Sequence, residues 1–246
     1  MSNALVETEL RGDVCVVWLK RPDKLNALSS GVERALEKAL SSPDVTGSGA
    51  VVLVGEGRAF SAGADITEFA DRDPEAIARY YRETGGVYER VATIPQPTLT
   101  AIHGYCLGGG LELALATDLR VADTTAVLGF PEVALGILPS SGGTVRATRL
   151  VGPAKAKELI LLGGRIDAVQ ALAAGLVTEV VAEGGALERA LELASALAEL
   201  PRLAVSVAKQ AIDAVPESSR EAALVIERLS YGLLAQTDAA KEQGGG

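Results

Sequence analysis

The feature of this sequence that most constrains its fold is a repeated order of apolar run, loop and helix, with glycine in several of the loops. Continuous apolar runs at residues 14–19, 50–54 and 98–102 are short enough for buried strands. Parallel strands need crossover connections, which are right-handed in nearly all proteins. The repeat therefore predicts an α/β core.

The chain changes character from about residue 152. Helical periodicity dominates there, with one strand expected at 177–181 and one long polar helix expected earlier, from residue 73 to about 93. A C-terminal part made of only a few helices cannot bury all of their apolar faces by itself. We expect residues 1–190 to form the core, and residues 191–246 to pack on that core or on another subunit.

Composition excludes several classes of function. The 246 residues are 48% hydrophobic and 22% charged, which suits one large packed domain. A net charge of −9 opposes binding to nucleic acid or anionic membranes. Two cysteines and one histidine are too few for a disulfide framework or a zinc cluster. We expect a cytoplasmic protein with no metal, no nucleic-acid partner and no membrane partner.

Targeting and membrane segments are not expected either. The first residues, MSNALVETELRGD, lack the basic start and apolar stretch of a secretory signal. The longest uncharged stretch, residues 91–111, contains two prolines, His103 and four glycines, which argues against a membrane helix.

Two glycine-bearing loops are candidates for ligand binding. The loop at 55–60 has Phe60 where a dinucleotide fingerprint needs its third glycine, and the loop at 104–110 lacks the Lys and Ser/Thr of a phosphate-binding loop. Their small residues, SAGAD at 61–65 and LGGGLEL at 107–113, leave backbone N–H groups uncovered. Such a pair can hold a developing oxyanion, although each glycine alone also fits an ordinary turn.

Two glutamates are candidates for acid–base chemistry. Glu112 stands among Leu111, Leu113 and other aliphatic residues, where burial raises the pKa of a carboxyl group. Glu132 follows Phe130 and a proline. Either could instead be a solvent-facing acid in the first turn of a helix. His103 is expected to be structural, which leaves the serines without a base and disfavours a serine hydrolase.

Three strings carry a resemblance to a known family. GRAFSAGADITEF (57–69), AIHGYCLGGGLELALATDLRVA (101–122) and LGFPEVALGILPSSGGTVRATRLVG (128–152) resemble the crotonase superfamily, specifically its enoyl-CoA hydratases. RPDKLNALS near the N-terminus is similar as well. The resemblance implies an α/β spiral of repeated ββα units, with a helical C-terminal part that forms trimers or covers the active site.

The resemblance also implies roles for particular residues. The N–H groups of Ala64 and Gly109 would form the oxyanion hole, and Glu112 and Glu132 would act as the catalytic pair. Contacts to coenzyme A and the acyl group are implied for five further residues: Leu25, Ala27, Ala62, Asp65 and Ile66.

The activity implied is hydration of trans-2-enoyl-CoA to 3-hydroxyacyl-CoA. Coenzyme A would enter only as part of the substrate, with no other cofactor, and the chain would form a trimer or a dimer of trimers. Two alternatives stay open: a Δ3-Δ2-enoyl-CoA isomerase or other reaction of the superfamily, and a noncatalytic RNA-binding or scaffold protein.

Overall fold

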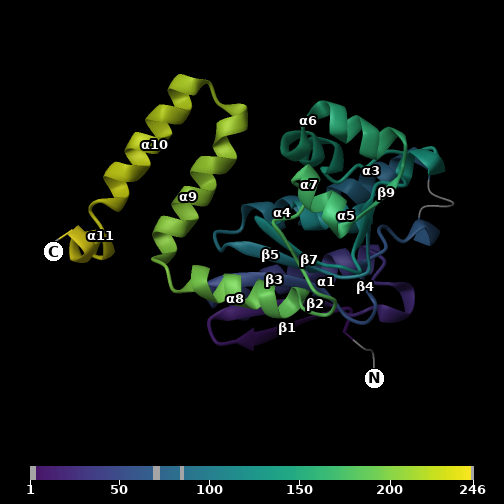
Figure 1. Cartoon of the computed structure of the whole chain (residues 1–246), viewed down its shortest axis with the longest axis horizontal. Coiled ribbons are helices and arrows are strands. Elements are labelled where there is room, and N and C mark those ends of the chain that lie inside the picture. Colours follow the sequence, from purple (N-terminus) through teal and green to yellow (C-terminus); the bar gives the residue numbers. More distant parts are fainter. Residues whose placement is uncertain (1–3, 69–72, 84–85, 245–246) are drawn as a thin grey trace.

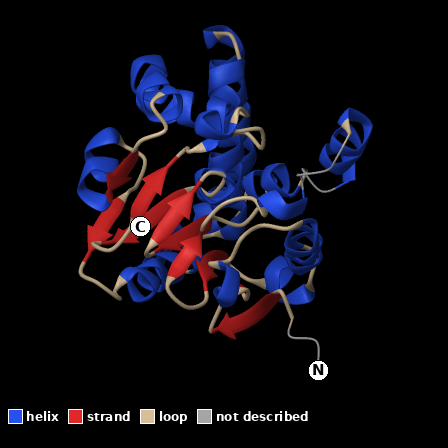
Figure 2. Ribbon diagram, turned by 90° about the vertical axis from the view of Figure 1, so that its right-hand side faces the viewer, coloured by secondary structure: helices blue, strands red, loops and turns tan. Residues whose placement is uncertain are grey.

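The computed structural model describes residues 4–68, 73–83 and 86–244. In these ranges two β-sheets pack among helices, and a pair of long helices extends away from them near the C-terminus (Figure 1). Turned by 90°, the strands form a central block with helices around it (Figure 2). The α/β class predicted from the sequence is confirmed.

The larger sheet has six strands within the described residues, in the order β1-β2-β3-β5-β7-β10. Neighbouring strands run parallel, except that β1 is antiparallel to β2. The strands are β1 (Val6–Arg11), β2 (Val14–Leu19), β3 (Ala50–Gly55), β5 (Thr98–Ile102), β7 (Leu119–Asp123) and β10 (Glu179–Val181).

The smaller sheet has strands of three residues each, in the order β4-β6-β8-β9. Strands β4, β6 and β8 are parallel, and β9 is antiparallel to β8. Their bounds are β4 (Ala59–Ser61), β6 (Tyr105–Leu107), β8 (Val127–Gly129) and β9 (Arg165–Asp167).

The remaining regular elements are helices and short 3₁₀ turns. The first of them begins after Ser29, whose side chain accepts a hydrogen bond from the N–H of Val32, as an N-cap does. The helices are α1 (Ser30–Leu40), α2 (Pro43–Gly47), α3 (Pro74–Glu83), α4 (Val87–Thr93), α5 (Gly109–Leu115), α6 (Gly143–Leu161), α7 (Ala168–Ala174), α8 (Ala186–Ala198), α9 (Arg202–Ala214), α10 (Arg220–Leu234) and α11 (Asp238–Gly244). Short 3₁₀ turns lie at Pro22–Lys24, Ile66–Glu68, Glu132–Leu135 and Val215–Glu217.

Pairs of strands give the core its repeat. β3 leads into β4, β5 into β6 and β7 into β8, and each pair contributes one strand to each sheet before a helix follows. The expected spiral of ββα units is confirmed. Because β4, β6 and β8 are parallel neighbours, their carboxyl ends lie at one edge of the small sheet. The three loops that follow these strands therefore meet.

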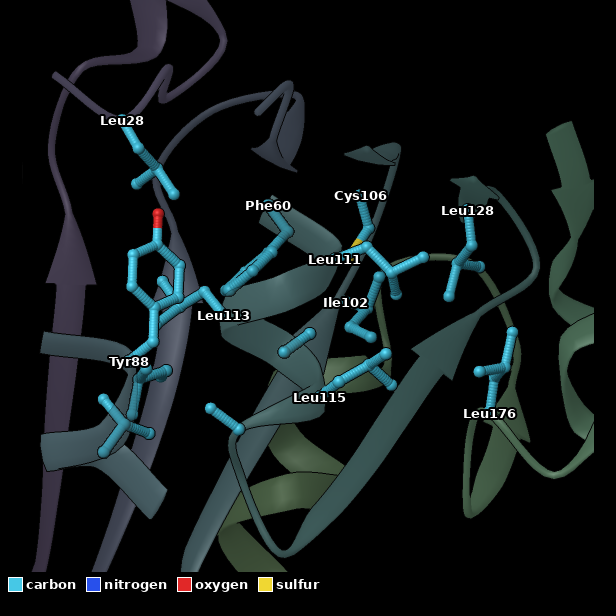
Figure 3. Close-up of a cluster of buried hydrophobic side chains, with 14 of the residues drawn as sticks. Leu28, Phe60, Tyr88, Ile102, Cys106, Leu111, Leu113, Leu115, Leu128 and Leu176 are labelled. Carbon is cyan, nitrogen blue, oxygen red and sulfur yellow. The ribbon is translucent and has the colours of Figure 1, made fainter. Parts of the chain in front are cut away.

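The central strands are buried on both faces. In β2, Val14 and Val16 belong to one apolar cluster and Cys15 and Val17 to another, because side chains alternate along a strand. The first cluster is covered by α8, and the second lies between the sheets and helices α1, α4 and α5. Part of the second is drawn in Figure 3, with Tyr88 at one end and Leu176 at the other.

Helices α9 and α10 differ from the core, because neither contains a buried residue. They pack against each other as an antiparallel pair (Figure 1). Large apolar side chains on the pair and the turns beside it are exposed: Leu200, Leu203, Ile212, Val215, Val225, Leu229, Tyr231 and Leu233. Burial therefore changes between α8 and α9, while the expected boundary at residue 190 falls inside α8. The division into 1–190 and 191–246 stays a prediction.

Two sequence expectations differ from the structure. The single helix expected over 73–93 is two helices, α3 and α4, and residues 84–85 lie outside the described ranges. Two glycines stand at 85–86 in the sequence, and glycine is a poor helix former. Strands β1, β4, β6 and β9 were not anticipated. None of the described helices is long and apolar enough to cross a membrane.

Candidate active site

The loop after β4 presents the backbone N–H of Ala64. Leu28 donates to the carbonyl of Gly63 at 2.8 Å and accepts from the N–H of Asp65 at 2.9 Å, which makes a parallel bridge centred on Ala64. In such a bridge the central residue directs its own N–H away from the partner strand. Gly63 has φ +101°, a conformation that favours glycine. The loop therefore leaves the Ala64 amide available to a ligand.

The loop after β6 presents a second amide beside the first. Gly109 is the first residue of α5, so its N–H has no partner within the helix. A Cβ built on Gly109 would lie 3.3 Å from the nitrogen of Ala64, and one built on Gly63 would lie 3.5 Å from the nitrogen of Gly109. No hydrogen bond from either N–H to a described residue is present. The structure thus brings together the two amides expected to form an oxyanion hole.

Glu112 lies on α5, three residues after Gly109, and its side chain is buried at 3% exposure. Its Oε1 accepts hydrogen bonds from the N–H of Ser141 at 2.7 Å and of Gly143 at 2.8 Å. Burial raises the pKa of Glu112, while these backbone bonds and the charge of Arg146 oppose the rise. The side chain is therefore fixed in direction and needs no ion-pair partner to be held.

Glu132 begins the 3₁₀ turn after β8 and is 8% exposed. Burial, with a smaller contribution from the charge of Glu112, raises the pKa of Glu132 to about 7. Its Oε2 is buried with no hydrogen-bond partner among the described residues. A Cβ on Gly108 would lie 2.7 Å from its Oε1, which explains the need for glycine there, at φ +50°. Glu132 can therefore exchange a proton near neutral pH.

The residues expected to contact coenzyme A lie in two loops that bind each other. Leu25 accepts from the N–H of Ala62 at 2.9 Å, and Arg21 bridges the carbonyl of Ala27 at 3.2 Å and Oδ2 of Asp65 at 2.7 Å. Hydrogen bonds from Thr67 and Arg21 lower the pKa of Asp65. Ile66, the fifth expected residue, is exposed at the start of the next turn. The loops hold all five residues in one region beside Ala64.

Sequence reasoning missed the residues that hold these elements in place. The side chain of buried Asn26 accepts a hydrogen bond from the N–H of Arg21 at 2.8 Å through its Oδ1. Its Nδ2 donates to the carbonyls of Glu56 and Ala59 at 2.9 and 2.8 Å. Its φ is +53°, and asparagine tolerates such a conformation better than most residues. A lone Asn in an otherwise apolar LNAL stretch was the available signal. The backbone partners of Glu112, about 30 residues further on, gave no comparable signal.

Residues considered for other chemistry have structural contacts. Ser61 is fully buried, and its hydroxyl donates to the carbonyl of Asn26 at 2.8 Å. The ring of His103 is hydrogen-bonded to the carbonyl of Gly57 at 2.9 Å. Among the described residues, no three His, Cys, Asp or Glu side chains are grouped to hold a metal ion.

Known proteins resemble this chain over nearly its whole length. The family model for enoyl-CoA hydratase/isomerase matches residues 9–244. A protein named "Probable enoyl-CoA hydratase" from Rhizobium meliloti (strain 1021) is 40% identical, covering 98% of this chain and 94% of its own. The 2,3-dehydroadipyl-CoA hydratase of Escherichia coli (strain K12) is 39% identical, covering 97% and 92%. The solved enoyl-CoA hydratase from Thermoplasma volcanium GSS1 is 32% identical, with a TM-score of 0.92 and coverage of 98% and 96%.

Proposed function

Because the chain belongs to the enoyl-CoA hydratase/isomerase family, we propose that it hydrates trans-2-enoyl-CoA thioesters to 3-hydroxyacyl-CoA. One observation carries the proposal: two buried glutamates with raised pKa values lie beside a pair of amides that have no hydrogen-bond partner among the described residues. Glu112 is on the helix that Gly109 begins, and Glu132 lies against Gly108. A family member that used a single acid would not need both carboxyl groups buried.

In the proposed reaction the thioester oxygen binds between the N–H groups of Ala64 and Gly109. Charge moves onto this oxygen as the thioester becomes enolate-like, and the two donors stabilise it. The amides belong to a loop and a helix start that are already fixed, so little reorganisation accompanies the charge transfer. Loss of one such donor costs about 10²-fold in rate.

The two carboxyl groups then divide the proton transfers. Glu112, whose Oε1 is held by two backbone N–H groups, takes a proton from water as the water oxygen bonds to C3. Glu132, with a pKa of about 7, gives its proton to C2. Exchange with solvent afterwards returns both groups to their starting states. Because Glu132 must be protonated, turnover in the hydration direction falls as pH rises above about 7.

Coenzyme A enters this reaction as part of the substrate, and we propose no further cofactor. The loops that carry Leu25, Ala27, Ala62, Asp65 and Ile66 lie beside the oxyanion pair, where they support contact with the thioester's carrier group. The exposed apolar faces of α9 and α10 support assembly into a homo-oligomer, with a trimer or a dimer of trimers as the expected form.

The test is turnover with a ladder of enoyl-CoA thioesters, including branched and ring-bearing acyl groups. Hydration of a 2-enoyl-CoA removes the conjugated absorbance and adds one water to the product mass. Isomerisation of a 3-enoyl-CoA creates that absorbance without a change in mass. Conversion of 3-enoyl substrates alone, or RNA binding without turnover of any thioester, would overturn the proposal.

A further inference from the structure

Three polar side chains are buried beside the oxyanion pair and have no part in the proposed proton transfers. They are Glu33 on α1, Tyr80 on α3 and Tyr88 on α4. Both phenol hydroxyls donate to the same oxygen, Oε1 of Glu33, from Tyr80 at 2.6 Å and from Tyr88 at 3.1 Å. We call these residues the Glu33 cluster.

The Glu33 cluster reaches the active site through Tyr88. A Cβ on Gly109 would lie 3.4 Å from the Tyr88 hydroxyl oxygen and 3.3 Å from the nitrogen of Ala64. One point beside Gly109 is thus in contact distance of both the phenol and the second oxyanion amide. Burial raises the pKa of Tyr88, and the charges of Glu33 and Glu112 add to the rise. The hydroxyl is therefore neutral and lies within electrostatic reach of the catalytic carboxyl group.

Neighbouring groups must hold the glycine turn, because glycine has no side chain to anchor itself. A Cβ on Gly108 would meet Oε1 of Glu132 at 2.7 Å, and one on Gly110 would meet Ser61 atoms at 2.6 to 2.9 Å. Gly109 carries the proposed oxyanion donor, and the polar side chain against it is Tyr88. A different polar residue thus occupies the space where each of the three glycines would carry a Cβ.

Glu33 fixes the direction of the phenol. Tyr88 has one hydroxyl proton, and it is committed to Glu33, so the lone pairs rather than the proton face the turn. A hydrogen bond to a carboxylate is stronger than one between neutral groups. Tyr80 donates to the same oxygen and restrains the carboxyl group from a second helix.

We propose that Tyr88 is a positioning residue for the oxyanion site, held in place by Glu33 and Tyr80. Its hydroxyl supports Gly109 so that the Gly109 N–H stays aligned with that of Ala64 as the thioester oxygen gains charge. This inference rests on the proposed acyl-CoA chemistry.

The first test is Tyr88→Phe, which removes only the hydroxyl. The expected result is a fall in kcat of about tenfold with KM within twofold, because misaligned donors weaken the transition state more than the bound substrate. A dialkylamino-cinnamoyl-CoA provides a second readout, since polarisation of its carbonyl moves the absorption maximum to longer wavelength. That shift becomes smaller in Tyr88→Phe. Tyr105→Phe, at an exposed phenol on β6, is the matched control and changes neither quantity.

The second test concerns the carboxyl group. Glu33→Gln keeps an oxygen acceptor for both phenols and retains most of the activity, whereas Glu33→Leu loses at least as much as Tyr88→Phe. The double variant Tyr88→Phe with Glu33→Leu is no worse than Glu33→Leu alone, because both changes act through one contact. If Glu33→Leu does not fold, Glu33→Gln is compared with Tyr88→Phe instead. Retained activity in Glu33→Gln beside reduced activity in Tyr88→Phe then supports the role of the hydrogen bond between the two side chains.

Several outcomes would overturn the positioning role. An unchanged kcat and an unchanged spectral shift in Tyr88→Phe would do so, as would a loss of thermal stability with both quantities intact. If the unmodified protein binds the chromophore with a shift but hydrates no thioester, the hydratase proposal fails while the shift in Tyr88→Phe still decides the role of the phenol.

Discussion

Helix α8 buries Ala186, Ala190 and Ala194 against the large sheet, whereas no residue of α9 or α10 is buried. The helices are similar in length and in apolar content, and they follow one another in the chain. Their burial differs because α8 has a sheet face to pack on, whereas α9 and α10 pack mainly on each other. The sheets give α8 an apolar surface to pack on within the chain, and the same core buries carboxyl groups, while the α9–α10 pair exposes apolar side chains that only another surface can cover.

The largest effect is expected where the core buries its two acids. Glu112→Gln and Glu132→Gln should each reduce hydration of a 2-enoyl-CoA by about 10³-fold, because an amide cannot transfer the proton. The assembly proposed for α9 and α10 should not change. Steady-state kinetics and size-exclusion chromatography with light scattering measure the two properties. Full activity in either variant would break the proposed assignment of the acids.

Removal of an oxyanion donor should have the next largest effect. Gly109→Pro deletes the N–H, and proline is accepted at the first position of a helix. We expect about a 10²-fold fall in kcat. Gly109→Ala is the control, because it keeps the N–H and adds the same Cβ as proline, 3.3 Å from the Ala64 nitrogen and 3.4 Å from the Tyr88 hydroxyl oxygen. Equal activity of the two variants would show that the N–H is not used.

A change on the α9–α10 pair should affect assembly instead of chemistry. Leu229→Glu places a charge on an exposed apolar position of α10 and should shift the protein to smaller species in light scattering. The melting of the core should stay within a few degrees of the unmodified protein. Leu10→Glu, at an exposed apolar residue of β1, should leave assembly intact. Unchanged assembly in Leu229→Glu would contradict the role given to this pair.

The smallest effect expected is on stability as a function of pH. The pKa of Glu132 rises from 4.5 to about 7 on folding, so protonation favours the folded state. This contribution of Glu132 to the stability of the folded state is complete below pH 4.5 and is lost as the pH rises through about 7. Glu132→Gln removes this pH dependence, so between pH 4.5 and 7 the unmodified protein should lose roughly 3 kcal/mol of stability relative to the variant. Urea denaturation at several pH values measures this, with the exposed Glu183→Gln as control.

The sequence was informative where a local pattern determines structure. Continuous apolar runs identified β2, β3 and β5, and the aliphatic neighbours of Glu112 indicated its burial. Strands of three residues, such as β4 and β6, are too short to produce a pattern. Glu33 stands in an amphipathic helix where charged residues are expected at the surface, and its burial follows from tyrosines about 50 residues away. Contacts between residues so far apart in the sequence can be identified only once the fold is known.

Strand β1 has a consequence for how the molecule meets its neighbours. It is the antiparallel strand at one edge of the larger sheet, and it carries Glu7, Glu9 and Arg11. An unpaired edge can recruit a strand of another molecule, and charges at the edge discourage this because they would lose water. The apolar α9–α10 pair has no such protection. The charges on β1 therefore disfavour pairing between the larger sheets of two molecules, which guards a concentrated protein against edge-to-edge aggregation.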